Sequence, residues 1–446
     1  MEHFADELRA EGFDVDHRRA PTLRQGLSDH VEEFDVGTVV AMEPLSWDAR
    51  ALLERLGVDL VRNDQFLCHY DDFASWASDR KRLMMEDFYR WQRFRLGVLI
   101  DDGANGPEPV GGRWNFDHDN REPPPRDGRS WPPITRFELD DIDRGVLERL
   151  PPTTFGADPD GTWPVTRAQA LTRLGEFIDH GLPFFGPHED AMLAAEWKLA
   201  HSVLASSMNI GLLHPDEIVE AAEAAYRNAT APLSSVEGFV RQVIGWREYV
   251  WGVYWLWMPE YRNRNALSAT RPVPPVFTGA ADTEMACVAS AVGHVRDHGY
   301  AHHIERLMVL GNLALTAGVD PLEMTEWMRA SFVDGADWVM LPNVVGMALF
   351  ADGGMMATKP YASGGAYINK MSDSCRSCRF DPKQRVGPDA CPYTTLYWDF
   401  LARNADSLAT NHRMARQLAA MRKLNNLPAV RDRAVEILDR LDRGAL

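Results

Sequence analysis

The chain has 446 residues, of which 45% are hydrophobic and 25% charged, as expected of an ordinary globular protein with two or three domains. No apolar run approaches the roughly 18–20 residues of a membrane span, and the N-terminus lacks the basic and apolar regions of a secretory signal. The formal net charge of −18 excludes a generally basic nucleic-acid-binding protein, although a local basic surface remains compatible with it. Five cysteines in so long a chain indicate a reduced, cytoplasmic setting, in which clustered cysteines suggest a metal.

The first part of the chain alternates helical and strand-like patterns. Its α-β-α-β order is typical of a parallel sheet wrapped by helices, and we assign residues 1–102 to such a domain. The segments are EHFADELRAEG (helix, 2–12), FDVDHRR (strand, 13–19), VGTVVAME (strand, 36–43), SWDARALLERLG (helix, 46–57) and VDLVRND (strand, 58–64).

Residues 103–165 are rich in proline, glycine and charge, as in NGPEPVGGRWNFDHDNREPPPRDGRSWPPI. This composition predicts a long connector between two domains. From Thr166, which can cap the next segment, the pattern is helical almost throughout, so residues 166–446 are predicted to form a large all-helical domain.

Three of the five cysteines lie close together as Cys375-x2-Cys378-x12-Cys391. Three thiolates leave a metal site incomplete, and Cys287, on a predicted helix, is the natural fourth ligand. Cys68 belongs to the first domain and is expected to be a small core residue. Four thiolates suit zinc or a 4Fe–4S cluster. Proline often follows a cysteine that ligates such a cluster, as it follows Cys391 here. The spacing of the cysteines does not decide between zinc and the cluster.

The helical half carries a second group of candidates in GYAHHIERLM. On a helix, His302 and His303 would lie four and three residues from Arg306, so imidazole and guanidinium could face one pocket. The alternative is a pair of histidines satisfied within the core.

Two further segments allow both a structural and a ligand-binding interpretation. The tryptophans of IGWREYVWGVYWLW, from Trp246 to Trp257, are typical of core packing but could also line a planar cofactor. The small and hydroxyl residues of AHSVLASSMNIGLL suit phosphate binding through backbone N–H groups, or close helix packing. A basic patch near the cysteines is either a nucleic-acid contact or a set of solvated charges: Lys359, Lys370, Arg376, Arg379, Lys383 and Arg385.

Together these segments resemble one family, the bacterial photolyases and cryptochromes that carry an iron–sulfur cluster. The likeness runs from about Arg113 to Arg403, through GGRWNFD, HSVLASSMNIGLL, VEGFVRQVIGWREY, YAHHIERLM, LGNLAL, LPNVVGMALFADGG, TKPYASGGAYINKMSDSCRSC and CPYTTLYWDFLARN. It continues more weakly into the first domain through MEPLSW and FLCHY. The four-cysteine set and the histidine pair are the most specific parts.

The resemblance implies an N-terminal α/β antenna domain, a connector and an all-helical domain that holds FAD. It implies that Cys287, Cys375, Cys378 and Cys391 ligate a 4Fe–4S cluster. Residues matching the family's flavin site are His201, Ser202 and Leu204 on the phosphate side, Arg306 and Asp334 beside the isoalloxazine ring, and Arg247, Trp327, Met340 and Asn343 elsewhere around it.

The activity implied is that of a carbon–carbon lyase, a DNA photolyase of the (6-4) type. Reduced, photo-excited flavin would donate an electron to a (6-4) pyrimidine photoproduct flipped out of ultraviolet-damaged DNA. A histidine would then supply a proton to the departing oxygen, His303 being the first candidate and His302 the second. We expect a monomer without membrane contact.

The chain also departs from the family pattern. A 6,7-dimethyl-8-ribityllumazine antenna is implied, yet the first strand with its Gly-Asp-Gln-Leu turn is missing, and the chain begins at the following helix. PVFTGAADTEM lacks the usual tryptophan before its Thr-Gly; Met328 stands where tyrosine is common, and Met340 where a polar or acidic side chain is common. Two alternatives therefore stay open: a blue-light photoreceptor without repair activity, and a zinc-stapled nucleic-acid-binding protein.

Overall fold

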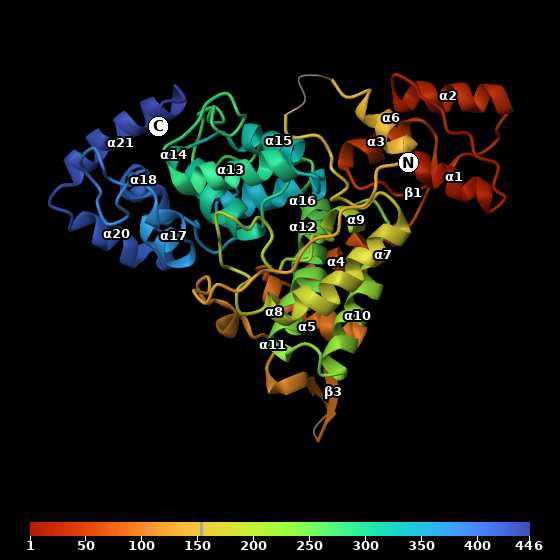
Figure 1. Ribbon diagram of the computed structural model, residues 1–446, viewed down its shortest axis with the longest axis horizontal. Coiled ribbons are helices and arrows are strands. Elements are labelled where there is room, and N and C mark those ends of the chain that lie inside the picture. Colours follow the sequence, from red (N-terminus) through yellow and green to blue (C-terminus); the bar gives the residue numbers. More distant parts are fainter. Residues whose placement is uncertain (105, 152–154) are drawn as a thin grey trace.

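The computed structural model describes residues 1–104, 106–151 and 155–446. Helices dominate, and the two ends of the chain lie at opposite ends of the molecule (Figure 1). The N-terminal elements are α1 (Glu2–Ala10), α2 (Leu23–Phe34), β1 (Val40–Met42), α3 (Trp47–Arg55) and β2 (Asp59–Val61). Among the described helices, none is long and apolar enough to cross a membrane.

The predicted parallel pairing is confirmed, but the sheet is small. β1 and β2 run parallel with Val40 opposite Asp59. The strand predicted over residues 13–19 is wrong: this stretch has no regular structure, and Phe13 is 60% exposed. Alternation of apolar and polar residues stabilises a strand only where a neighbouring strand completes the hydrogen bonds, and here no partner is at hand.

The middle of the chain joins the two halves without a break in the core. It contains α4 (Tyr70–Ala77), α5 (Met85–Leu96), the hairpin of β3 (Ile100–Gly103) and β4 (Gly106–Pro109), η1 (Val110–Gly112), η2 (Asp117–Asn120) and α6 (Asp141–Leu147). Phe73 and Phe88 pack against Tyr249 of the helical half. The domain limits at residues 102 and 165 therefore stay predictions.

Beyond residue 165 the described chain has helices and irregular loops, as expected. Thr166 caps the first helix by accepting a hydrogen bond from the N–H of Gln169. The elements are α7 (Arg167–Glu176), η3 (Phe177–Gly181), α8 (Leu182–Phe185), α9 (Ala205–Asn209), α10 (Pro215–Arg227), α11 (Leu233–Val240), η4 (Arg241–Arg247), α12 (Glu248–Trp257), η5 (Glu260–Asn263), α13 (Ala286–His298), η6 (Glu305–Gly311), α14 (Asn312–Ala317), α15 (Pro321–Ser331), α16 (Asp337–Leu341), η7 (Pro342–Ala348), α17 (Gly365–Met371), η8 (Ser374–Arg376), α18 (Pro392–Arg403), α19 (Ala405–Leu408), η9 (His412–Met414), α20 (Ala415–Arg422) and α21 (Leu427–Asp442).

Helix α12 is the centre of the core. Four of its five aromatic side chains are buried, the exception being the partly buried Trp257, and Trp251 and Tyr254 have no exposed surface. Gly252 lets α4 approach closely, because a Cβ at this position would lie 2.1 Å from the ring of Phe73. An α/β N-terminal part packed on a large helical body is the expected fold class.

Candidate functional site

The four predicted cysteine ligands come together around one cavity. Cys287 lies in the first turn of α13, Cys375 in η8, and Cys391 immediately before α18. All four, including Cys378, line the same cavity, together with apolar neighbours such as Phe380. Cys68 is fully buried and does not line this cavity, in agreement with its predicted core role.

These thiols would resist ionisation without a cation. Burial and the nearby sulfurs raise the pKa of Cys375 to about 12. Burial and the other three sulfurs also raise the pKa of Cys287 well above its usual value. A bound metal centre reverses this, because its positive charge stabilises thiolates. The donor set therefore fits a soft metal centre.

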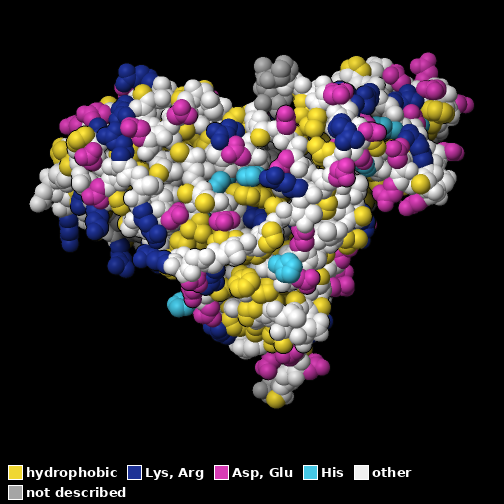
Figure 2. Space-filling model, viewed as in Figure 1, with side chains coloured by type: hydrophobic (Ala, Val, Ile, Leu, Met, Phe, Trp, Pro, Cys, Tyr) yellow, Lys and Arg dark blue, Asp and Glu magenta, His cyan; other side chains and the backbone are white. Residues whose placement is uncertain are grey.

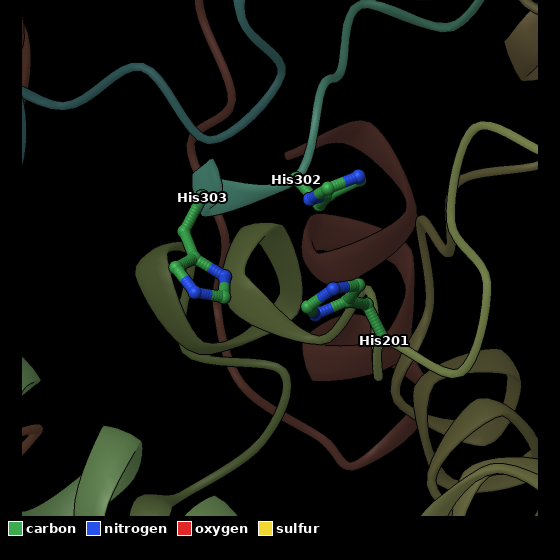
Figure 3. A group of neighbouring side chains, drawn as sticks. All are labelled: His201, His302 and His303. Atoms are coloured by element: carbon green, nitrogen blue, oxygen red, sulfur yellow. The ribbon is translucent and has the colours of Figure 1, made fainter. Parts of the chain in front are cut away.

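Three histidines form the second cluster (Figure 3). The rings of His201 and His302 stack with centroids 4.8 Å apart and planes 12° apart. His303 meets His201 edge-on at 5.3 Å. The spacing had suggested that His302 lies inside a helix, but it precedes the first helical residue. Its carbonyl accepts a hydrogen bond from the N–H of Arg306.

The three histidines differ in exposure. His201 and His302 are buried, and burial holds the pKa of each well below its usual value, so both are neutral at pH 7. The side chain of His303 is 48% exposed and lies 3.4 Å from a carboxylate oxygen of Asp190. One nitrogen from each ring lies within 4.8 Å of the other two. Parallel stacking, however, does not direct the lone pairs of His201 and His302 to one point, so a shared metal ion is not favoured.

The predicted charged pair is formed. Two guanidinium nitrogens of Arg306 donate to the two carboxylate oxygens of Asp334 at 2.9 and 3.0 Å. The Nε atom of Arg306 donates to the carbonyl of Ala301, and its guanidinium lies 4.3 Å from the ring centre of Phe332. Such a bidentate pair, held from three sides, keeps a fixed geometry.

The predicted phosphate-side segment lies just before α9. Leu199 and Val203 adopt positive φ angles of 45° and 50°, which are strained for these residues and shape a sharp turn. His201 and Leu204 are buried, and Ser202 is partly buried.

Several buried polar atoms around this region have no hydrogen-bond partner among the described residues. Native proteins rarely leave such atoms unsatisfied, and a polar ligand is one explanation. The atoms are Nε2 of His201, both ring nitrogens of His302, Oγ of Ser206 and Ser207, and Nε of Arg247. The chain thus offers donors and acceptors of the kind that a dinucleotide uses.

The remaining predicted flavin contacts are spread over η4, α15, α16 and η7. Trp327 donates its indole N–H to the carbonyl of Phe277, Met340 is buried, and Asn343 donates to the carbonyl of Val339. Arg247 is held by Glu248 at 2.7 Å. Contact with a flavin stays a prediction for each of them.

Two acidic residues near the histidines were not predicted. They are Asp190, described above, and Glu189, whose carboxyl is buried. One carboxyl oxygen of Glu189 has no partner among the described residues, and the other lies 3.7 Å from Arg241. Burial raises the pKa of Glu189 to about 7. The pair sits in an irregular loop, GPHEDAML, whose sequence carries no motif that would have revealed it.

Lysine and arginine side chains gather at the end of the molecule that carries α17 and α20 (Figure 2). Of the six predicted patch residues, all of which the structure describes, Arg379 alone forms an ion pair, with Glu284 at 2.8 Å. Arg376 and Lys383 are exposed and have no acidic partner within the described chain.

Comparison with known proteins gives consistent matches. A family model described as deoxyribodipyrimidine photo-lyase-related protein matches residues 1–157. The chain is 42% identical to a (6-4) photolyase of Agrobacterium fabrum over 459 positions, covering 99% of this chain and 89% of that protein. It is 34% identical over 99 residues to Uncharacterized protein R855 of Acanthamoeba polyphaga mimivirus, covering 22% of this chain and 73% of that one.

Among solved structures, a bacterial class III photolyase from Agrobacterium tumefaciens superposes with a TM-score of 0.51. The match covers 95% of this chain and 83% of that one, at 16% identity. At this identity the likeness concerns the fold, and it confirms the fold class expected from the sequence.

Proposed function

The chain belongs to the photolyase and cryptochrome family, and on this premise we propose that it repairs (6-4) pyrimidine photoproducts in DNA with light and FAD. The supporting observation is the 42% identity, over nearly the whole chain, to a protein named a (6-4) photolyase. FAD, when bound and reduced, would supply the electron that opens the lesion after it absorbs blue light.

His303 is the proposed proton donor. Its ring is half-exposed, so a nucleotide flipped out of the duplex can reach it, and a carboxylate oxygen of Asp190 lies 3.4 Å from its Nε2 atom. His302 is fully buried and neutral, which suits it better to holding the neighbouring rings in place. The proton passes from His303 to the oxygen that leaves the modified base.

Arg306 and Asp334 would hold the ring of the cofactor, and the segment from His201 to Leu204 would lie along its phosphates. The buried, partnerless polar atoms of His201, Ser206 and Ser207 support a polar ligand on this side. Arg247 and its aromatic neighbours would form walls of the flavin cavity and exclude water from it.

Cys287, Cys375, Cys378 and Cys391 would hold a 4Fe–4S cluster. No three of the four sulfurs lie within 4.8 Å of one another, whereas four sulfurs ~2.3 Å from one zinc ion would be about 3.8 Å apart. The wider spacing supports a multi-iron centre over a single zinc ion. Binding of a 6,7-dimethyl-8-ribityllumazine antenna stays a prediction for the N-terminal part, whose described parallel sheet consists of β1 and β2.

The test is repair of an oligonucleotide that contains one (6-4) photoproduct, by flavin-loaded protein under blue light. We expect repair by the wild type and a loss of about 10²–10⁴-fold in the His303→Ala variant, the usual contribution of a proton-transfer group, at unchanged flavin content. A flavin-replete wild type that repairs nothing would favour the photoreceptor. Repair by His303→Ala at the wild-type rate would remove the proton-donor assignment.

A further inference from the structure

A buried histidine and a buried glutamate form a pair next to His201, His302 and His303, here called the histidine cluster. His294 of α13 and Glu305 of η6 are 9% and 3% exposed. The Nδ1 atom of His294 lies 3.1 and 3.2 Å from the two carboxyl oxygens of Glu305. One of these oxygens, Oε2, also lies 3.7 Å from Nε2 of His302. Two imidazoles therefore compete for one carboxyl group.

His294 and Glu305 hold one proton between them. The Nε2 atom of His294 lies 3.2 Å from the carbonyl of Ala194, which can only accept a hydrogen bond, so Nε2 carries hydrogen. The Nδ1 atom then either carries a second hydrogen and donates to an ionised Glu305, or accepts from a protonated Glu305. In both forms the pair has no net charge, and its two groups titrate as a unit.

The surroundings make the pair hold this proton firmly. Burial opposes the charged form of His294, but the hydrogen bond to Glu305 and the charge of its carboxylate raise the pKa of His294 above its usual value. Burial raises the pKa of Glu305 as well, against the hydrogen bond from His294. Both directions keep the shared proton on the pair at neutral pH.

His302 is the competing partner for Glu305. It has no exposed surface, and neither of its ring nitrogens has a hydrogen-bond partner among the described residues. An unpaired carboxylate 3.7 Å away would draw a proton onto this ring, because a nearby opposite charge stabilises the imidazolium. With His294 in place the carboxylate is already neutralised, and burial holds the pKa of His302 well below its usual value.

The other charged groups beside the pair are engaged elsewhere. Arg306 follows Glu305 in the chain and is held by Asp334 at 2.9 Å. Asp297 of α13 pairs with Arg296 at 2.8 Å. Within the described chain, Glu305 is therefore left to the two histidines.

The charge of His302 matters because the proposed proton donor is close to it. The ring centroids of His302 and His303 are 6.3 Å apart, and one nitrogen of each ring lies within 4.8 Å of the other. A proton on the buried ring would repel a proton on His303. It would equally repel one on His201, which stacks on His302. If Glu305 drew a proton onto His302, the exposed ring would lose the proton that repair needs.

We propose that His294 is a positioning residue for the repair reaction. By sharing a proton with Glu305 it withholds this carboxylate from His302, so that His302 stays neutral and the proton for repair stays on His303. The inference rests on the proposed function for its effect on repair. The charge of His302 itself does not depend on that function, so the two can fail separately.

The first test measures the charge of His302 without any repair. Flavin-loaded protein with isotope-labelled histidine is examined by nitrogen NMR, which distinguishes bare from protonated ring nitrogens, and the His302 signals are identified by their loss in His302→Gln. We expect a neutral His302 in the wild type at pH 7. In His294→Asn, whose amide can donate to Glu305 but cannot share a proton, we expect hydrogen on both nitrogens of His302.

A charged His302 in the wild type, or a neutral one in His294→Asn, overturns the inference. His294→Phe is the second variant should His294→Asn not fold. It keeps a ring in the same place and carries the same expectation for His302.

The second test is the pH dependence of repair. A charged His302 should lower the pH above which repair fails by about 0.5 to 2 units, for a unit charge 6.3 Å away at an effective dielectric constant of about 80 to 20. We expect this shift in His294→Asn and its reversal in His294→Asn/Glu305→Gln, in which no carboxylate remains to charge His302. Such a rescue would not follow if His294 served only to fill space.

Asp297→Asn is the matched control. It removes a carboxylate from the same helix as His294, but the side chain of Asp297 is 50% exposed and pairs with Arg296, so the pH limit of repair should stay that of the wild type. A wild-type pH limit in His294→Asn, or no recovery in the double variant, overturns the inference. A flavin-replete wild type that repairs nothing contradicts the proposed function instead, and the NMR measurement still decides the charge of His302.

Discussion

At the scale of single residues, the carboxyl of Glu189 makes stability depend on pH. Burial raises its pKa to about 7 from an ordinary value of 4.5. The folded protein therefore keeps a proton that the unfolded chain releases, and the stability due to this group is complete below pH 4.5 and is lost as the pH rises through 7. Glu189→Gln removes that loss. Its unfolding free energy at pH 8 should exceed that of the wild type by at most about 3 kcal/mol, at 1.36 kcal/mol per pKa unit.

The measurement is urea unfolding of both proteins at pH 4 and pH 8, and the difference should vanish at pH 4. Arg241 keeps Asp117 at 3.2 Å as a partner, so the variant does not leave it isolated. Glu220→Gln, on the exposed face of α10, is the matched control and should change stability by no more than about 0.5 kcal/mol at either pH. A stability difference for Glu189→Gln that is equal at pH 4 and 8 would contradict the pKa assignment.

At the scale of elements, the cysteine cluster joins helices that are far apart in the sequence. Cys287 comes from α13, and the other three cysteines come from the segment between α17 and α18. Metal binding at such a site contributes directly to folding. In Cys287→Ser we expect the iron content per protein chain to fall sharply, because one of four ligands is lost, and the thermal midpoint to fall with it.

Iron and acid-labile sulfide analysis, with a thermal melt, checks this expectation. Cys68→Ala is the matched control, since it removes a buried thiol that does not line the cysteine cavity and should keep the full iron content. Wild-type iron content in Cys287→Ser would show that this cysteine is not a ligand. Zinc in place of iron would favour the zinc-stapled alternative.

Features with local signals could be predicted at this scale. The helix that Thr166 caps and the parallel pairing of β1 with β2 follow from propensity and pattern, and both are present. The strand predicted from alternation at Phe13 is absent, because a strand depends on a partner that the local sequence does not specify. The helix predicted through His302 starts one residue later, within the usual uncertainty of helix ends.

The candidate site likewise contains residues that the sequence could predict and residues that it could not. Arg306 and Asp334 were matched from a family motif, and they do pair. Glu189 and Asp190 lie beside the histidines because an irregular loop returns to them, and nothing in a single sequence reports such a contact. The aromatic segment around Trp251 was visible in the sequence, but its contact with Trp338, which comes from another helix, was not.

At the scale of the whole molecule, the proposed function requires an acidic protein to bind an acidic partner. The net charge of −18 repels DNA at a distance, so any binding has to rely on a local surface. Arg376 and Lys383 are exposed and have no acidic partner within the described chain, which leaves both charges free for phosphate. Each phosphate contact contributes about 0.9 to the slope of log K against log salt concentration. The double variant Arg376→Ala/Lys383→Ala should therefore lower that slope by about 2 if both residues touch phosphate.

The measurement is fluorescence anisotropy of labelled duplexes, with and without a (6-4) photoproduct, over a series of salt concentrations. Phosphate contacts carry no lesion information, so both duplexes should be weakened equally. Arg24→Ala/Arg55→Ala is the matched control, because these arginines are exposed and lie on α2 and α3 at the other end of the molecule (Figure 1). If this control lowers the slope as much as the patch variant does, net charge rather than the patch governs binding. If only the damaged duplex is weakened, the two patch residues contact the lesion and not the backbone.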